Sequence, residues 1–156
     1  MRPSSRFFLL IALLCILLPS AACSASASNA SVATAESLTR AYVNAYQGKD
    51  ALKYLGLMDK DAIYSDQDRS SIRNAGDFFI RDLNTAIVQT FQDPVFAYVC
   101  KSYFVSSDGR FANVQCLYTD KGKDGKPATV PAVSILEFKN GKIIEEIMYY
   151  DGSPYE

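Results

Sequence analysis

The spacing of apolar residues changes once along the chain, from a helical repeat to strand-like alternation. Apolar side chains recur every three or four positions over residues 35–46, which predicts a helix with one buried face. Two more helices are expected to follow. One is short and begins at Asp50. The other runs from about Asp77 to Asp93, where the next residue, a proline, ends it. The side chains expected to face inward from these two helices are Leu52, Leu55 and Met58, and then Phe79, Leu83, Ala86 and Ile87.

From Val95 onward the period is two, which predicts β-strands. Asn140-Gly141 between the last two runs is the strongest two-residue hairpin signal. Helices followed by an antiparallel meander predict an α+β domain rather than a parallel α/β one. The four strand-like runs cover residues 95–105, 111–120, 128–138 and 142–151; a short strand at 61–64 and a polar loop at 65–73 are expected between the helices.

The Asn140-Gly141 turn sets the register of the last hairpin. A type I′ turn would place Ser134 opposite Ile147 and Ala132 opposite Tyr149. A sheet face that is partly apolar predicts a homodimer through the sheet, although it could equally be a solvated surface. The residues on the face opposite Ser134 would be Val133, Ile135, Ile144, Met148 and Tyr150, interrupted by Glu137 and Glu146.

The loop of the first hairpin determines whether the two cysteines of its strands face each other. A three-residue loop at 107–109 places Cys100 opposite Cys116, whereas a two-residue Asp108-Gly109 turn would offset them by one position. With the three-residue loop a cross-strand disulfide is expected. The residues that would share the face of the cysteines, suited to packing against the helices, are Phe96, Tyr98, Phe104 and Val114.

The N-terminal segment is typical of a secretory signal peptide over residues 1–22. Two arginines precede twelve apolar residues, fewer than the roughly 20 that a membrane-spanning helix needs. The run Ser20-Ala-Ala-Cys23 resembles a bacterial lipobox, in which Cys23 is lipidated, while ordinary cleavage after Ala22 or Ala27 is the alternative. Residues 23–35 are expected to form a flexible tether, residues 36–151 the folded domain and residues 152–156 a C-terminal tail.

This segment predicts an exported protein that is secreted or resides in the periplasm or cell envelope. Contact with a membrane is expected only through a lipid on Cys23. Export would place Cys100 and Cys116 in an oxidising compartment, where an even pair of cysteines can form a disulfide.

Composition excludes several classes of protein. The 156 residues carry 16 basic and 17 acidic side chains, a net charge of −1 that gives no reason to expect nucleic acid as a partner. The chain has no histidine, so catalytic triads, histidine zinc sites and histidine-ligated haem are excluded. The aspartates at positions 59, 61, 66 and 68 lack the glycine and glutamate of a calcium-binding loop. Neither a metal nor a cofactor is expected.

Three segments are similar to the nuclear transport factor 2-like superfamily, in its SnoaL-like and ketosteroid-isomerase-like branches. The resemblance spans residues 36–151 and implies a cone-shaped fold, a cystatin-like roll in which a curved antiparallel sheet wraps helices around an apolar pocket. Many members pair through the outer sheet face. The segments that carry the resemblance are residues 38–50, 58–66 and 131–151.

The same resemblance implies a candidate site. In ketosteroid isomerases a tyrosine on the first helix, an aspartate after the first strand and an acidic donor on the third long strand form the site. Tyr42 and Asp66 match the first two positions, as oxyanion donor and general base, but Ser134 occupies the third and is a weaker donor. The plainer alternatives are a core tyrosine and a loop-capping aspartate. The residues expected around a ligand are Tyr42, Tyr46, Tyr98, Ser134, Tyr149 and Asp151, the last of which could also be a solvated charge.

Three functions follow from these observations. The preferred one is an exported SnoaL-like domain that binds a small, largely apolar molecule in a conical pocket, without established catalysis. The second is a proton-transfer enzyme, an isomerase or a cyclase, that uses Asp66 and Tyr42. The third is a protein-interaction module that acts through the sheet face. Ser134 favours binding, because an isomerase of the known type would need a stronger acid at that position.

Overall fold

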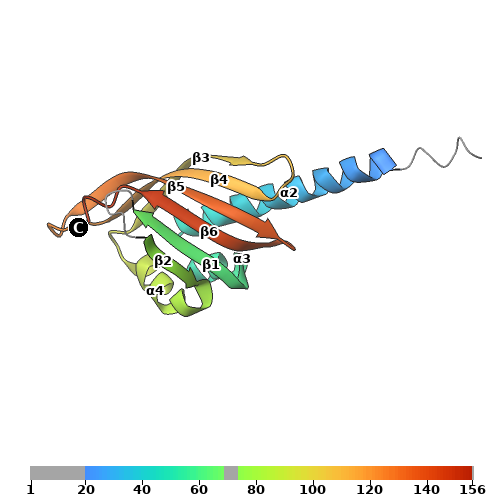
Figure 1. Cartoon of the computed structure of the whole chain (residues 1–156). Coiled ribbons are helices and arrows are strands. Elements are labelled where there is room, and N and C mark those ends of the chain that lie inside the picture. The colour runs from blue at the N-terminus through green and yellow to red at the C-terminus, as the bar shows by residue number, and fades with distance from the viewer. Residues whose placement is uncertain (1–19, 69–73, 156) are drawn as a thin grey trace, which may run out of the picture.

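One long helix and two short ones lie along a curved six-stranded sheet in the computed structural model, which describes residues 20–68 and 74–155 (Figure 1). This is the expected α+β class. The helices are α2 (Ser20–Gln47), α3 (Ala51–Leu57) and α4 (Ile80–Gln92). The strands are β1 (Met58–Asp68), β2 (Asn74–Phe79), β3 (Ala97–Val105), β4 (Phe111–Lys121), β5 (Pro127–Lys139) and β6 (Lys142–Tyr150).

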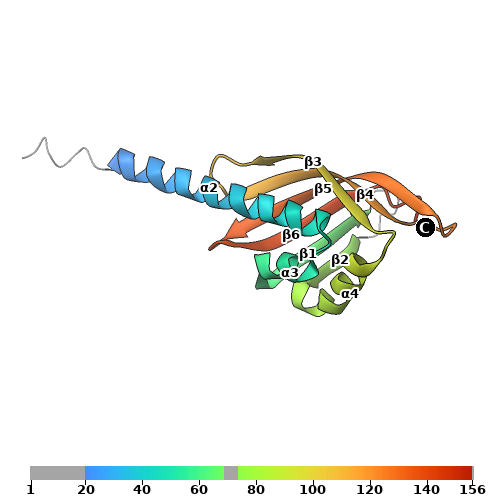
Figure 2. The same cartoon turned by 180° about the vertical axis from the view of Figure 1, so that it is seen from behind.

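The strands follow the order β2-β1-β6-β5-β4-β3 across the sheet. All neighbours are antiparallel except β1 and β6, which run parallel. The expectation of an antiparallel sheet therefore needs correction at this one pair. Seen from behind, α2 runs along the sheet on the side of β3 and β4, while α3 and α4 lie beside β1 and β2 (Figure 2).

The strands of the second half confirm the alternating pattern, and each begins and ends within two residues of its expected bounds. The first half differs more. Strand β1 starts earlier than expected and continues to Asp68, into the expected polar loop, and β2 replaces the expected start of the third helix. Both strands are held by backbone pairing with distant or neighbouring strands, which needs no regular apolar pattern in their side chains. Helix α4 consequently begins at Ile80, and Phe79 is partly exposed as its N-cap.

Helix α3 buries a different residue from the one expected. Asp50 caps it by accepting a hydrogen bond from the Lys53 backbone at 3.0 Å. This start places Tyr54 in the core at 1% exposure and leaves Leu52 79% exposed. The prediction that Leu52 faces inward is therefore wrong.

The segment expected to be a flexible tether is helical in the structure, because α2 begins at Ser20. Its many alanines are strong helix formers and favour a helix over a flexible chain. The Ser31 hydroxyl donates to the Asp108 carbonyl at 3.0 Å, so this part of α2 contacts the β3–β4 loop. Gly109, with a φ of +69°, permits the approach, since an added Cβ would lie 2.5 Å from the Ser31 backbone. No helix in the described ranges has the length and hydrophobicity to cross a membrane.

A bulge in β6 changes which side chains enter the core. Phe138 pairs with Ile143 as expected, but Ile144 is an extra residue, and beyond it the register moves by one position. Ser134 therefore pairs with Met148 rather than Ile147, and Ala132 with Tyr150 rather than Tyr149. The shift brings Glu146, Met148 and Tyr150 to the inner face and moves Ile147 and Tyr149 to the outer face, which reverses the expected assignment.

A second bulge, at Lys101, affects the first hairpin. Cys100 pairs with Cys116 as the three-residue loop implied, and a disulfide joins them. The loop itself is longer, since Ser106 donates its backbone N–H to the Phe111 carbonyl, and the bulge compensates for the difference. Phe104 therefore lies on the outer face, 64% exposed, and the expectation that it packs against the helices is wrong.

Candidate functional site

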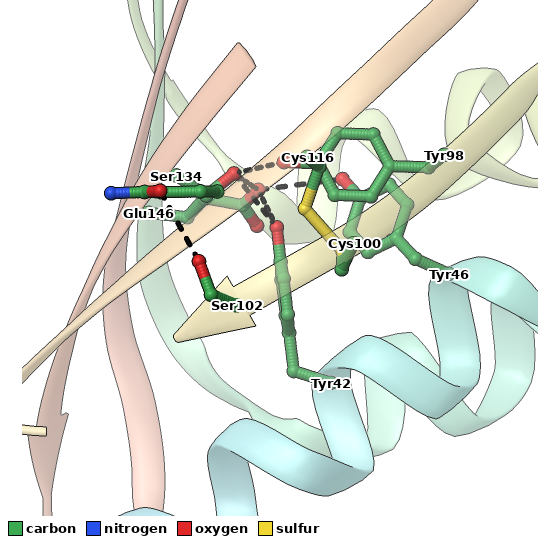
Figure 3. Close-up of a disulfide and its surroundings, with 9 residues drawn as sticks. Tyr42, Tyr46, Tyr98, Cys100, Ser102, Cys116, Ser134 and Glu146 are labelled. Atoms are coloured by element: carbon green, nitrogen blue, oxygen red, sulfur yellow. Dashed lines mark hydrogen bonds between the residues drawn. A yellow bond between two sulfur atoms is a disulfide. The ribbon is translucent and has the colours of Figure 1, made fainter. Parts of the chain in front are cut away.

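A carboxyl group lies buried at the centre of the domain. Glu146 on β6 has no exposed surface, and its two oxygens accept hydrogen bonds from tyrosines of two helices. Tyr42 donates to Oε1 at 2.5 Å and Tyr54 donates to Oε2 at 2.7 Å, while the Tyr46 hydroxyl lies 3.4 Å from Oε1. Figure 3 shows Tyr42 and Tyr46 reaching from α2 towards Glu146.

Ser134 links this carboxyl to a further phenol. Its Oγ lies 2.7 Å from the Tyr98 hydroxyl, 3.0 Å from that of Tyr42 and 3.4 Å from Glu146 Oε1. A phenol has one proton, and Tyr42 stands closer to the carboxyl than to the serine. The strongest hydrogen bond of Ser134 is therefore its short contact with Tyr98, in which either hydroxyl can be the donor. We call these residues the carboxyl cluster: Tyr42, Tyr46, Tyr54, Tyr98, Ser134 and Glu146.

The cluster stabilises its carboxyl with hydroxyl donors rather than with a cation. Burial raises the pKa of Glu146, and the hydrogen bonds from the tyrosines and Ser134 oppose that rise without cancelling it. Burial and the neighbouring Glu146 raise the pKa values of Tyr42, Tyr46 and Tyr54 well above the ordinary phenol range. The phenols thus stay protonated and remain donors.

Beside the cluster is a cavity of about 240 Å³ between α4 and the sheet. Two members of the cluster, Tyr46 and Tyr54, also line the cavity. Leu83, Ala86 and Ile87 of α4 line it too, which confirms that they share one side of the helix, although Ala86 is exposed. The expectation that Phe79 shares this inward side is wrong, since it precedes the helix and is 43% exposed. The aromatic residues of the wall are Tyr46, Tyr54, Tyr64, Phe91, Phe96 and Tyr118.

One lining residue is charged among those that the structure describes. Asp120, near the end of β4, accepts a hydrogen bond from the Tyr118 hydroxyl at Oδ2 over 2.7 Å and one from the Lys121 backbone N–H at Oδ1 over 2.7 Å. These two bonds hold the carboxylate at the cavity. Desolvation and Asp120 raise the pKa of Tyr118.

The residues expected around a ligand fall into three groups. Tyr46 lines the cavity, whereas Tyr42, Tyr98 and Ser134 belong to the carboxyl cluster behind its wall. Tyr149 lies on the outer face of the sheet because of the β6 bulge, and Asp151 is exposed beyond β6. The Asp151 carboxylate accepts the Ser153 backbone N–H at 3.1 Å, which is a turn contact.

The backbone of Asp66 lies in β1 and pairs with Met148, a cavity residue. Its side chain is outside the described part of the structure, as are residues 1–19 of the expected signal peptide and the side chain of Cys23.

Sequence reasoning missed three functional groups. Asp120 follows Cys116 and Tyr118 at alternate positions of the same strand, so the alternation predicts that it shares their inner face. Tyr54 lies one helical turn after the Asp50 cap, and this spacing is only weak evidence that it faces the core. Glu146 was expected on the outer face, because the strand alternation does not reveal the extra residue at Ile144. In the described residues no three potential metal ligands lie together.

Comparison with known proteins agrees with this architecture. The sequence pattern of the SnoaL-like domain matches residues 39–146. A putative polyketide cyclase from Xanthomonas campestris is similar in structure, with a TM-score of 0.64, 16% identity and coverage of 79% of this chain and 94% of that one. A putative polyketide cyclase from Pseudomonas putida is also similar, with a TM-score of 0.62, 19% identity and coverage of 78% of this chain and 94% of that one.

A third similar structure is a hypothetical protein with a ketosteroid-isomerase-like fold from Catenulispora acidiphila, in complex with trimethylamine. Its TM-score is 0.57, at 17% identity and coverage of 76% of this chain and 88% of that one. A search of curated proteins gives no match.

Proposed function

Because the chain belongs to the SnoaL-like domain family, we propose that it binds a small, largely apolar molecule in the cavity beside α4. The observation that carries this proposal is the cavity wall, which is mostly aromatic and aliphatic and has a single carboxylate among its described residues. Each square ångström of apolar ligand surface that leaves water contributes about 25 cal/mol, so such a wall suits a ligand without many polar groups. The similar Catenulispora protein holds a small organic molecule, which is a precedent within the fold.

The test uses the methyl groups of Leu83 and Ile87 as NMR reporters during titration with small aromatic molecules, both neutral and charged. Saturable shifts of these methyls in the unmodified protein support the proposal. Ala86→Phe should fill the cavity and abolish the shifts. Thr85→Phe, at the preceding exposed position of α4, is the matched control and should leave them unchanged. Absence of saturable shifts with every probe would contradict the proposal.

Proton transfer is the second candidate function. It is supported by β1, which brings the backbone of Asp66 beside Met148 of the cavity wall. The position of Tyr42 argues against this function, because its hydroxyl donates to Glu146 and its ring does not line the cavity. Deuterium exchange next to the carbonyl of a bound ketone, lost in Asp66→Asn while the melting temperature is kept, would favour the enzyme over the binding domain.

Export is part of the same proposal. A disulfide between Cys100 and Cys116 supports a location in an oxidising compartment. We propose that residues 1–22 direct the chain there and that Cys23 is lipidated. Metabolic labelling with a palmitate analogue tests the lipid, and Cys23→Ala should remove the label.

A further inference from the structure

The tyrosines that line the cavity direct their hydroxyl groups at protein acceptors. Tyr54 donates to Glu146 at 2.7 Å, and the Tyr46 hydroxyl lies 3.4 Å from the same carboxyl. Tyr118 donates to Asp120 at 2.7 Å, and the Tyr64 hydroxyl lies 3.8 Å from the Met148 sulfur, a weak acceptor. A ligand in the cavity therefore meets aromatic rings and lone pairs far more than it meets hydrogen-bond donors.

Few donors remain in the wall as the structure describes it. Thr90, an exposed residue of α4, is the one further hydroxyl among the described lining residues, and none of them is a lysine or an arginine. A ligand that carries a carboxylate or a carbonyl needs a donor, so this wall suits it poorly.

The charge on the described lining residues has one sign, and it is negative. Asp120 supplies a carboxylate, and half of the described lining residues are aromatic, with π-systems whose faces are negative. One ring already accepts a cation from outside the cavity, since the Lys49 ammonium lies 5.9 Å from the centre of Phe96. A cation within about 6 Å of an aromatic ring is attracted to it, and recognition of quaternary ammonium groups by several rings is the best-known use of this attraction.

We propose that the cavity is selective for a small organic ammonium, a cation that carries apolar substituents, with the rings as its cage and Asp120 as its counter-ion. The inference rests on the proposed function, because it names the class of ligand that the same cavity binds. The cavity volume of about 240 Å³ limits the ligand to a small molecule. Tyr118 acts as a positioning residue, since its hydroxyl holds the Asp120 carboxylate in place.

The test compares three probes of nearly equal shape and different charge: phenyltrimethylammonium, tert-butylbenzene and benzenesulfonate. Affinities are measured on the unmodified protein by titration of the Leu83 and Ile87 methyl signals. The ammonium should bind about tenfold tighter than each of the other two, which corresponds to roughly 1.4 kcal/mol. A cavity that offered only apolar contacts would bind tert-butylbenzene more tightly than the ammonium, because the ammonium must lose more hydration than the neutral hydrocarbon.

Asp120→Asn tests the counter-ion. The amide oxygen can still accept the Tyr118 proton, and the charge is lost, so ammonium affinity should fall about fivefold to tenfold while tert-butylbenzene changes less than twofold. Asp124→Asn removes an equal charge from an exposed turn outside the cavity wall and should have little effect on either probe. If Asp120→Asn fails to fold, the ranking of the three probes on the unmodified protein decides.

Two results would overturn the inference. If tert-butylbenzene or benzenesulfonate binds as tightly as the ammonium, selectivity for a cation is wrong, while binding in the cavity stands. If none of the three probes causes saturable shifts, both the inference and the proposed function fail.

Discussion

The hydroxyl of Tyr42 donates to the carboxyl of Glu146 over 2.5 Å, although 104 positions separate the two residues in the chain. The bond joins α2 to β6 across the core. Both side chains are fully buried, so neither can exchange its partner for bulk water without opening the domain. This bond and the one from Tyr54 give the carboxyl cluster a structural role in addition to any part in ligand binding.

Replacing Glu146 should test that role. Glu146→Leu leaves the Tyr42 and Tyr54 hydroxyls without their acceptor, and each unpaired buried donor costs about 1–3 kcal/mol, so we expect a loss of about 3 kcal/mol in unfolding free energy. Urea denaturation provides the measurement. Glu145→Leu, at the adjacent outer-face position, should change stability by less than about 0.5 kcal/mol. Equal effects at the two positions would show that the cluster contributes no particular stability.

The unfolding free energy should depend on pH through the protonation of Glu146. Burial raises its pKa in the folded protein above the ordinary value of 4.5, so the folded state holds this proton more tightly than the unfolded state. Its contribution to stability is then complete below about pH 4.5 and is lost as the pH rises through the folded pKa.

Urea denaturation between pH 4 and pH 8 measures this effect as the stability of the unmodified protein minus that of Glu146→Gln. The difference should decrease as the pH rises. An increase with pH would mean that the hydroxyl donors outweigh burial and lower the pKa of Glu146.

The Cys100–Cys116 disulfide should stabilise the domain by about 3 kcal/mol, as estimated for a closed loop of about 15 residues. The double variant Cys100→Ser, Cys116→Ser should lose that amount in urea denaturation. Mass spectrometry of the exported, non-reduced protein after alkylation should find neither cysteine labelled. Two labelled cysteines in this sample would show that the bond is not formed in the native compartment.

The outer sheet face should mediate a homodimer. The β3 bulge places Phe104 on this face, and Phe104, Val99 and Phe111 are 64%, 50% and 37% exposed. We expect light scattering at micromolar concentration to give twice the monomer mass, and Phe104→Glu to halve it. Leu52→Glu, at an exposed leucine of α3 away from the sheet, is the control and should leave the dimer intact. A monomeric unmodified protein would rule out this association.

Much of this fold follows from local patterns of apolar residues. Alternation over residues 95–151 is a local property, since each strand needs one apolar face, and it located four strands and the Asn140-Gly141 hairpin correctly. The helical repeat likewise located α2 and the cavity face of α4, including Leu83 and Ile87. The resemblance to the SnoaL-like family added the arrangement of these elements.

Which polar groups meet in the core depends on the pairing of whole strands. An extra residue at Ile144 reverses the faces of β6, and Lys101 does the same in β3. Such bulges depend on how neighbouring strands pair across the sheet, and the alternation of each strand taken by itself does not reveal them. Because the side-chain period of a strand is two, a one-residue shift sends Glu146 into the core and Tyr149 out of it. The buried carboxyl at the centre of this protein is a consequence of that single shift.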